Sequence, residues 1–223
     1  MQRIDKKTAV CYARRLVIYI LGMFIIALGV SVSKASDLGV APVNSIPAVL
    51  SEITNIDIGI CTTAIFIGFI LLQICIMRRE YKIINLLQIL CSTLFGYFVS
   101  LTNTLCTAFL PVCPNYFVQI LYILISIVLV ALGILLYIEA DIMSMPAEGV
   151  MQAVAYKTGI AFSTAKLIFD WSVIIIAAVL SLVFLHSLVG VREGTVIAAF
   201  GVGLCLKLIT RLLQKPLKRF LRE

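Results

Sequence analysis

The chain has 223 residues, of which 62% are hydrophobic and only 13% are charged, and its mean hydropathy is +1.12. This composition excludes a water-soluble globular protein and is typical of an integral membrane protein. A helix needs about 20 apolar residues to cross a bilayer, so the chain has room for about five to seven spans and for no sizeable domain outside the membrane. The formal net charge of +7 raises the possibility of a nucleic-acid partner, which depends on where the charges lie.

Long uncharged runs predict six transmembrane helices, because a charge in the middle of the bilayer costs several kcal/mol. One run is about twice the length of a span, and its break at Pro111 and Pro114 divides it into the third and fourth helices. The sixth run contains Lys207 and Arg211, whose side chains we expect to extend toward the interface. The six predicted spans cover approximately residues 16–33, 58–77, the two halves of 83–138, 167–186 and 194–213.

The distribution of Lys and Arg predicts the orientation. With a cytoplasmic N-terminus, 16 basic residues lie inside and only Lys34 and Arg192 lie outside. The positive-inside rule therefore places both termini in the cytoplasm of a bacterial inner membrane. Because the positive charge flanks the spans, we expect no nucleic-acid partner; the partner is the lipid bilayer, and residues 207–222 face anionic head groups. A homo-oligomer remains open.

An internal repeat with an offset of 104 residues is the most informative feature of the sequence. ALGVSVSKASDLGVAP at residues 27–42 aligns with ALGILLYIEADIMSMP at residues 131–146, and seven of the 33 pairs from residue 27 to residue 59 are identical. Ser33-Lys34-Ala35 resembles a signal-peptide cleavage site, but the same segment recurs inside the chain, where no signal acts. The sequence therefore predicts two units, residues 1–115 and 116–223.

Each unit contains three spans, and an odd number of crossings inverts the second unit relative to the first. The loop at residues 78–82 is strongly positive, whereas its counterpart at residues 191–194 is nearly neutral, in agreement with inversion. Inverted repeats with broken elements at matching places are typical of secondary transporters. The predicted fold class is therefore an all-α membrane protein with six transmembrane helices in two inverted three-span repeats, each with a re-entrant half-helix.

The two half-helices are predicted near residues 42–53 and 146–157, each starting at a proline. A helix start favours an anion or a polar ligand. Asp37 and Asp141 either contact such a ligand or cap these helices, and for each aspartate alone we favour capping. Asn44 and Glu148 each lie two residues after the proline and are better placed to face a cavity.

Lys166 and Asp170 are four residues apart in the fifth span and can form an ion pair on one helical face. An intramembrane carboxyl group indicates a functional site by default, although a purely structural pair near the cytoplasmic end explains the pattern equally well. Proton coupling would need Asp170 or Glu148 to exchange protons, which burial permits by raising a carboxyl pKa. The candidate substrate-binding residues are Asp37, Pro42, Asn44, Asp141, Pro146, Glu148, Lys166 and Asp170.

The stretch ALGVSVSKASDLGVAPVNSIPAVLSEITNIDIGICTTAIFIGF, with residues 166–170 and 189–195, resembles the YczE/YyaS/YitT family of bacterial membrane proteins, most closely its YczE-like branch. The resemblance covers about residues 12–213. It implies an integral membrane protein with a transport or export-related role and no catalytic residues.

Other patterns give no sign of an enzyme, a cofactor or a metal site. His186 is the only histidine, and the seven cysteines form no C-x-x-C motif. Only Cys106 and Cys113 are placed to form a disulfide, and we favour free thiols. Walker, H-E-x-x-H and G-x-S-x-G motifs do not occur. We therefore expect a secondary transporter or exporter of a small polar or ionic solute; the alternative is a membrane scaffold or regulatory partner of a neighbouring complex.

Overall fold

The computed structural model describes residues 6–111 and 115–222, and the regular structure in these ranges is helical. Six helices are long and apolar enough to cross a bilayer, which confirms the predicted number of spans. Two helices of 13 residues and two short 3-10 turns complete the described chain. The long helices are α1 (Lys6–Ala35), α3 (Ile58–Met77), α4 (Gln88–Phe109), α5 (Tyr116–Ala140), α7 (Phe162–Leu185) and α8 (Glu193–Arg222); the short ones are α2 (Pro42–Thr54), α6 (Pro146–Thr158), η1 (Arg78–Glu80) and η2 (Ile83–Leu87).

The sequence repeat reappears in the helix boundaries. The half-helices α2 and α6 begin at Pro42 and Pro146, and the helices that follow them, α3 and α7, begin at Ile58 and Phe162, so both pairs keep the offset of 104 residues. The backbone repeats as well, because Asp37 and Asp141, which follow α1 and α5, both have left-handed φ angles, of 59° and 50°. Each unit is therefore a long helix, a half-helix and two further long helices.

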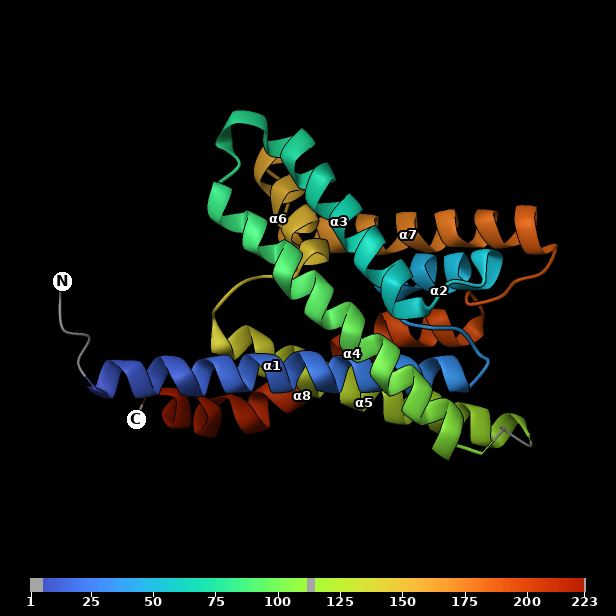
Figure 1. Cartoon of the computed structure of the whole chain (residues 1–223), viewed down its shortest axis with the longest axis horizontal. Helices are drawn as coiled ribbons and strands as arrows, with labels where there is room; N and C mark the ends of the chain where they lie inside the picture. Colours follow the sequence, from blue (N-terminus) through green and yellow to red (C-terminus); the bar gives the residue numbers. More distant parts are fainter. Residues whose placement is uncertain (1–5, 112–114, 223) are drawn as a thin grey trace.

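The two units interlock through equivalent helices. α1 and α5 run in opposite directions side by side and form the most extensive helix pair of the bundle (Figure 1). Their close approach depends on small residues, since a Cβ on Gly133 would lie 2.6 Å from the main-chain oxygen of Gly22. Each half-helix also packs on the other unit, α2 against α7 and α6 against α3. The half-helices thus lie between the units, where protein surrounds their ends.

One packing relationship breaks the symmetry. α4 packs on α1 and also on α3, and its equivalent α8 packs on α5. However, α8 has almost no contact with α7, although these helices are the counterparts of α4 and α3. The second unit is therefore more open than the first between its last two helices.

Two details differ from the predicted spans. The sixth helix does not end near residue 213 but continues to Arg222, where Gln214 donates a hydrogen bond of 2.7 Å to Glu139 and the guanidinium group of Arg14 lies over the ring of Phe220. These contacts hold the start of α1 and the end of α8 at the same end of the bundle (Figure 1). Cys106 is a free thiol, and Cys113, its predicted possible partner, lies outside the described residues, as does most of the turn between the third and fourth spans.

Candidate functional site

The half-helices start without a side-chain cap. Their N-cap residues are Ala41 and Met145, and neither helix has a side-chain capping hydrogen bond at its start. The interpretation of Asp37 and Asp141 as N-caps is therefore wrong. Both aspartates lie five residues before the prolines, where they end the preceding long helices, and Asp141 is the C-cap of α5. Their carboxylates are too early in the chain to reach the starts of α2 and α6.

The start of α6 is instead fixed from α3. The side-chain nitrogen of Gln73 donates to the carbonyl oxygen of Pro146 at 2.9 Å and to the side-chain oxygen of Gln88 at 3.0 Å. A Cβ on Gly149 would collide with Gln73, so this glycine allows the contact. At the matching place in α2 the hydroxyl of Ser45 donates to the carbonyl of Pro42 at 2.7 Å. Sequence reasoning did not find Gln73, because no spacing signal connects it to residue 146.

A cavity of about 210 Å³ lies between the two half-helix starts. We call it the central cavity. Five of the eight predicted site residues line it: Pro42, Asn44, Glu148, Lys166 and Asp170. Most of the remaining wall is apolar and includes the parallel rings of Phe66 and Phe95, whose centroids are 5.5 Å apart. The repeat therefore brings residues from α2, α6 and α7 together around one space.

The charged groups of the central cavity form a partly paired set. The ammonium group of Lys166 lies 2.7 Å from Oδ2 of Asp170, which confirms the predicted ion pair. Asp170 is buried, with 6% of its surface exposed. Glu148 occupies the first turn of α6, where a carboxylate complements the helix dipole, and it interacts with the phenol of Tyr137 and with Lys166 from other helices.

Three residues that line this space each have one buried side-chain oxygen with no hydrogen-bond partner among the described residues. These oxygens are Oδ1 of Asn44, Oε2 of Glu148 and Oδ1 of Asp170. Buried polar atoms are nearly always paired, because an unpaired one loses its hydration without compensation. Three unpaired acceptors around one cavity are therefore the arrangement expected of a binding site that a donor-bearing ligand completes.

A second hollow also borders Glu148. It has a volume of about 550 Å³ and lies beside α6, and we call it the α6 crevice. Glu148 and Tyr137 line both the α6 crevice and the central cavity. Asp141 and Ser144, in the link between α5 and α6, line the crevice only. Glu148 thus lies where the α6 crevice and the central cavity meet.

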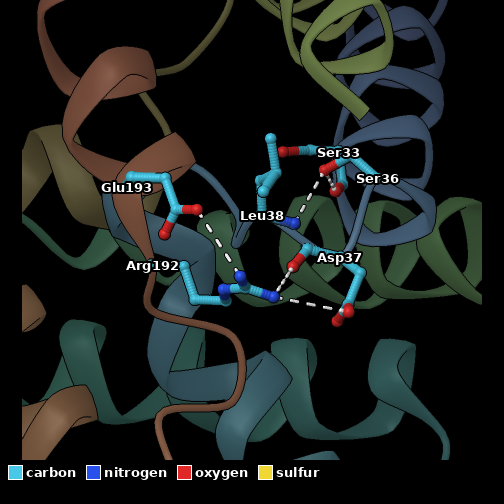
Figure 2. Close-up of polar contacts among 6 residues, drawn as sticks. All are labelled: Ser33, Ser36, Asp37, Leu38, Arg192 and Glu193. Carbon is cyan, nitrogen blue, oxygen red and sulfur yellow. Dashed lines mark hydrogen bonds and ion pairs between the residues drawn. The ribbon is translucent and has the colours of Figure 1, made fainter. Parts of the chain in front are cut away.

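At the matching place beside α2, the link between α1 and α2 is closed. Residues 37–40 pair with residues 190–194, and we call this contact the seal. Gly194 donates its main-chain N–H to the carbonyl of Leu38 at 2.9 Å, and Val40 donates to the carbonyl of Gly190 at 3.2 Å. Arg192 covers the pair, donating to the main-chain oxygen of Asp37 at 2.8 Å and pairing with its carboxylate and with Glu193 (Figure 2).

Burial shows the difference between the two links. Leu38 and Val40 in the seal are 0% and 1% exposed, whereas Ile142 in the equivalent link is 42% exposed. Ser144, the counterpart of Val40, is only partly buried. The two repeats therefore have equivalent helices, but the link in the first repeat is closed and the link in the second repeat is open.

The remaining predicted site residues lie outside the central cavity. The side chain of Asp37 is 80% exposed in the seal, and Asp141 is exposed in the α6 crevice. Pro146 begins α6 and contacts Gln73 rather than the cavity. Within residues 12–111 and 115–221, no group of three or more His, Cys, Asp or Glu residues is placed to hold a metal ion.

Comparison with known proteins gives a family without an assigned activity. A model described as a family of unknown function, DUF6198, matches residues 13–211, and the chain belongs to this family. No curated protein and no solved structure matches the chain. The match runs from α1 into α8 and includes both half-helices and the central cavity. The resemblance to the YczE-like branch stays a prediction.

Proposed function

We propose that this member of the DUF6198 family is a secondary transporter of a small polar or ionic solute that works by alternating access. It resides in a bacterial inner membrane with both termini in the cytoplasm, so the α6 crevice faces the cytoplasm and the seal faces outward. Asn44, Glu148 and Asp170 contact the solute or a coupling ion in the central cavity. The solute passes unchanged, and the protein is not an enzyme.

One observation carries this proposal. Two equivalent links are in opposite states, with residues 38–40 buried in the seal and residues 142–144 lining an open crevice. In transporters built from inverted repeats, the two halves exchange conformations around a fixed site, so one side is closed while the other is open. A membrane scaffold has no need for this difference, nor for unpaired acceptors in a cavity.

The exchange of states gives the transport cycle. In the opposite state, residues 141–144 close against the loop that precedes α4, which already borders the α6 crevice through Ile84 and Asn85. At the same time residues 37–40 separate from residues 190–194. Glu148 stays beside the solute in both states because it belongs to the half-helix and not to either link.

Solute uptake into proteoliposomes tests the proposal. Purified full-length protein is reconstituted and screened with small amines, carboxylates and neutral polar solutes, with and without a proton gradient. We expect at least one solute to be taken up, and Glu148→Gln to reduce that uptake. Glu80→Gln is the matched control, because Glu80 lies in the η1 turn and pairs with Lys157 away from the cavity. Equal uptake by Glu148→Gln and the wild type would remove Glu148 from the proposed site.

A further inference from the structure

The chemistry of the central cavity restricts the class of its ligand. The three unpaired atoms, on Asn44, Glu148 and Asp170, are all hydrogen-bond acceptors, and two of them belong to carboxyl groups. They belong to α2, α6 and α7, so three different helices each contribute one such residue to the lining. A ligand that satisfies all three must offer several N–H or O–H donors.

The charge of the cavity favours a cation. Lys166 is the only basic residue in its lining, and Asp170 already pairs with it at 2.7 Å. Glu148 interacts with the phenol of Tyr137 but forms no ion pair among the described residues, so the lining holds two carboxyl groups and one basic group. The start of α6, which would otherwise attract an anion, already holds Glu148 in its first turn. An anionic ligand would therefore meet acceptors and a like charge.

The size and walls of the cavity restrict the rest of the ligand. A volume of about 210 Å³ is below the roughly 300–1,000 Å³ of pockets for drug-sized molecules. The walls away from the three acceptors are apolar, with Phe66 and Phe95 among them. The cavity is also bordered by α7 and α8, which hardly touch each other, and a smaller apolar hollow that includes Trp171 continues between them.

We propose that the central cavity binds a small amphipathic amine, whose ammonium group is held by Asn44, Glu148 and Asp170 and whose apolar part lies against the aromatic wall and the gap between α7 and α8. An ammonium group has three donors and no acceptor, which matches three lining residues that each have an unpaired acceptor. This inference rests on the proposed function for its site, but it concerns binding and does not require transport.

Isothermal titration calorimetry on the purified full-length chain in detergent tests the inference. The probes are hexylammonium, hexanoate and hexanol, which share one apolar tail and differ in the head group. We expect hexylammonium to bind saturably and hexanoate and hexanol not to bind. Loss of one charge-assisted hydrogen bond corresponds to about a ten-fold or larger weakening, which we expect for Glu148→Gln and for Asn44→Leu. Glu80→Gln should bind hexylammonium as the wild type does.

Two variants keep the test decisive if one of them fails to fold, since Asn44 and Glu148 lie on different helices. Binding of hexanoate equal to that of hexylammonium would overturn the inference, as would binding of none of the three probes or amine binding that both variants leave unchanged. Amine binding without uptake of any solute by proteoliposomes would uphold this inference and reject the transport proposal. Uptake of an anionic solute without amine binding would uphold the transport proposal and reject this inference.

Discussion

Arg192 donates a hydrogen bond from its guanidinium group to the main-chain oxygen of Asp37 at 2.8 Å, across 155 positions of the sequence (Figure 2). The accompanying ion pair is longer, at 3.5 Å, and the carboxylate of Asp37 is largely exposed. Exposed ion pairs contribute about 0–1 kcal/mol, so the contact with the backbone is the more important part. Through it, the residue that precedes α8 holds the segment after α1 in the conformation that closes the seal.

Replacing Arg192 should therefore change access more than stability. For Arg192→Met we expect a loss of at most about 1 kcal/mol of folding free energy, because the lost contacts are exposed. We also expect faster modification of a cysteine at position 40, since the seal opens more often. Arg79→Met serves as the control, because Arg79 is exposed in η1, away from the seal. Equal labelling rates in the two variants would contradict this role of Arg192.

Gly39, which is buried in the seal, should tolerate no side chain. Its φ of 99° disfavours any side chain, and a Cβ would collide with Oγ1 of Thr195 and lie 2.8 Å from the main-chain nitrogen of Arg192. We expect Gly39→Ala to cost about 1–3 kcal/mol and to lower the thermal midpoint measured in detergent. Gly68→Ala in α3 is the control, because a Cβ there meets no atom within 4 Å and alanine favours a helix. An unchanged midpoint for Gly39→Ala would show that the seal tolerates a side chain.

The hydrogen bonds of Gln73 predict a non-additive pair of substitutions. Gln73→Leu leaves the carbonyl of Pro146 and the side chain of Gln88 without their partner, which should cost about 1–3 kcal/mol. Adding Gln88→Leu removes one of these unpaired groups, so the double variant should be less unstable than the sum of the single ones. Thermal unfolding of all three variants in detergent measures this coupling. Strict additivity would mean that the two glutamines do not act together.

The pair Lys166–Asp170 allows a similar test within the cavity. Lys166→Met leaves a buried carboxylate without its ammonium partner and should lower the thermal midpoint. The double variant Lys166→Met/Asp170→Asn removes both charges, and we expect it to regain most of the lost stability. A double variant less stable than Lys166→Met would indicate that Asp170 has another partner in the folded protein.

The parts of the fold that follow from local rules could be predicted from the sequence. Hydropathy and length identify the six spans, and the prolines at 42 and 146 set the starts of both half-helices to the residue. The repeat offset then placed Asn44 and Glu148 at equivalent positions, and both line the central cavity. The spacing of Lys166 and Asp170 on one helical face was enough to predict their ion pair.

Contacts between distant segments could not be predicted in this way. Gln73 and Pro146, or Arg192 and Asp37, meet only because of how the helices pack, and a single sequence gives no signal for such pairs. The capping interpretation of Asp37 and Asp141 failed because each aspartate ends one helix instead of starting the next. The repeat predicts only that the two links are equivalent. It does not predict that one link is closed while the other is open, because this difference belongs to one conformation of the chain.

The most direct test of alternating access compares modification of Val40→Cys and Ser144→Cys by a membrane-impermeant maleimide, in a background where the native cysteines are replaced by serine. Ile56→Cys and Tyr156→Cys are exposed reference positions near the ends of α2 and α6. We predict that Ser144→Cys is modified from the cytoplasmic side only, and that Val40→Cys is protected until Gly39→Ala or Arg192→Met opens the seal, after which it is modified from the outside only. Modification of both positions from the same side, or of Val40→Cys as fast as Ile56→Cys in the intact seal, would contradict the account.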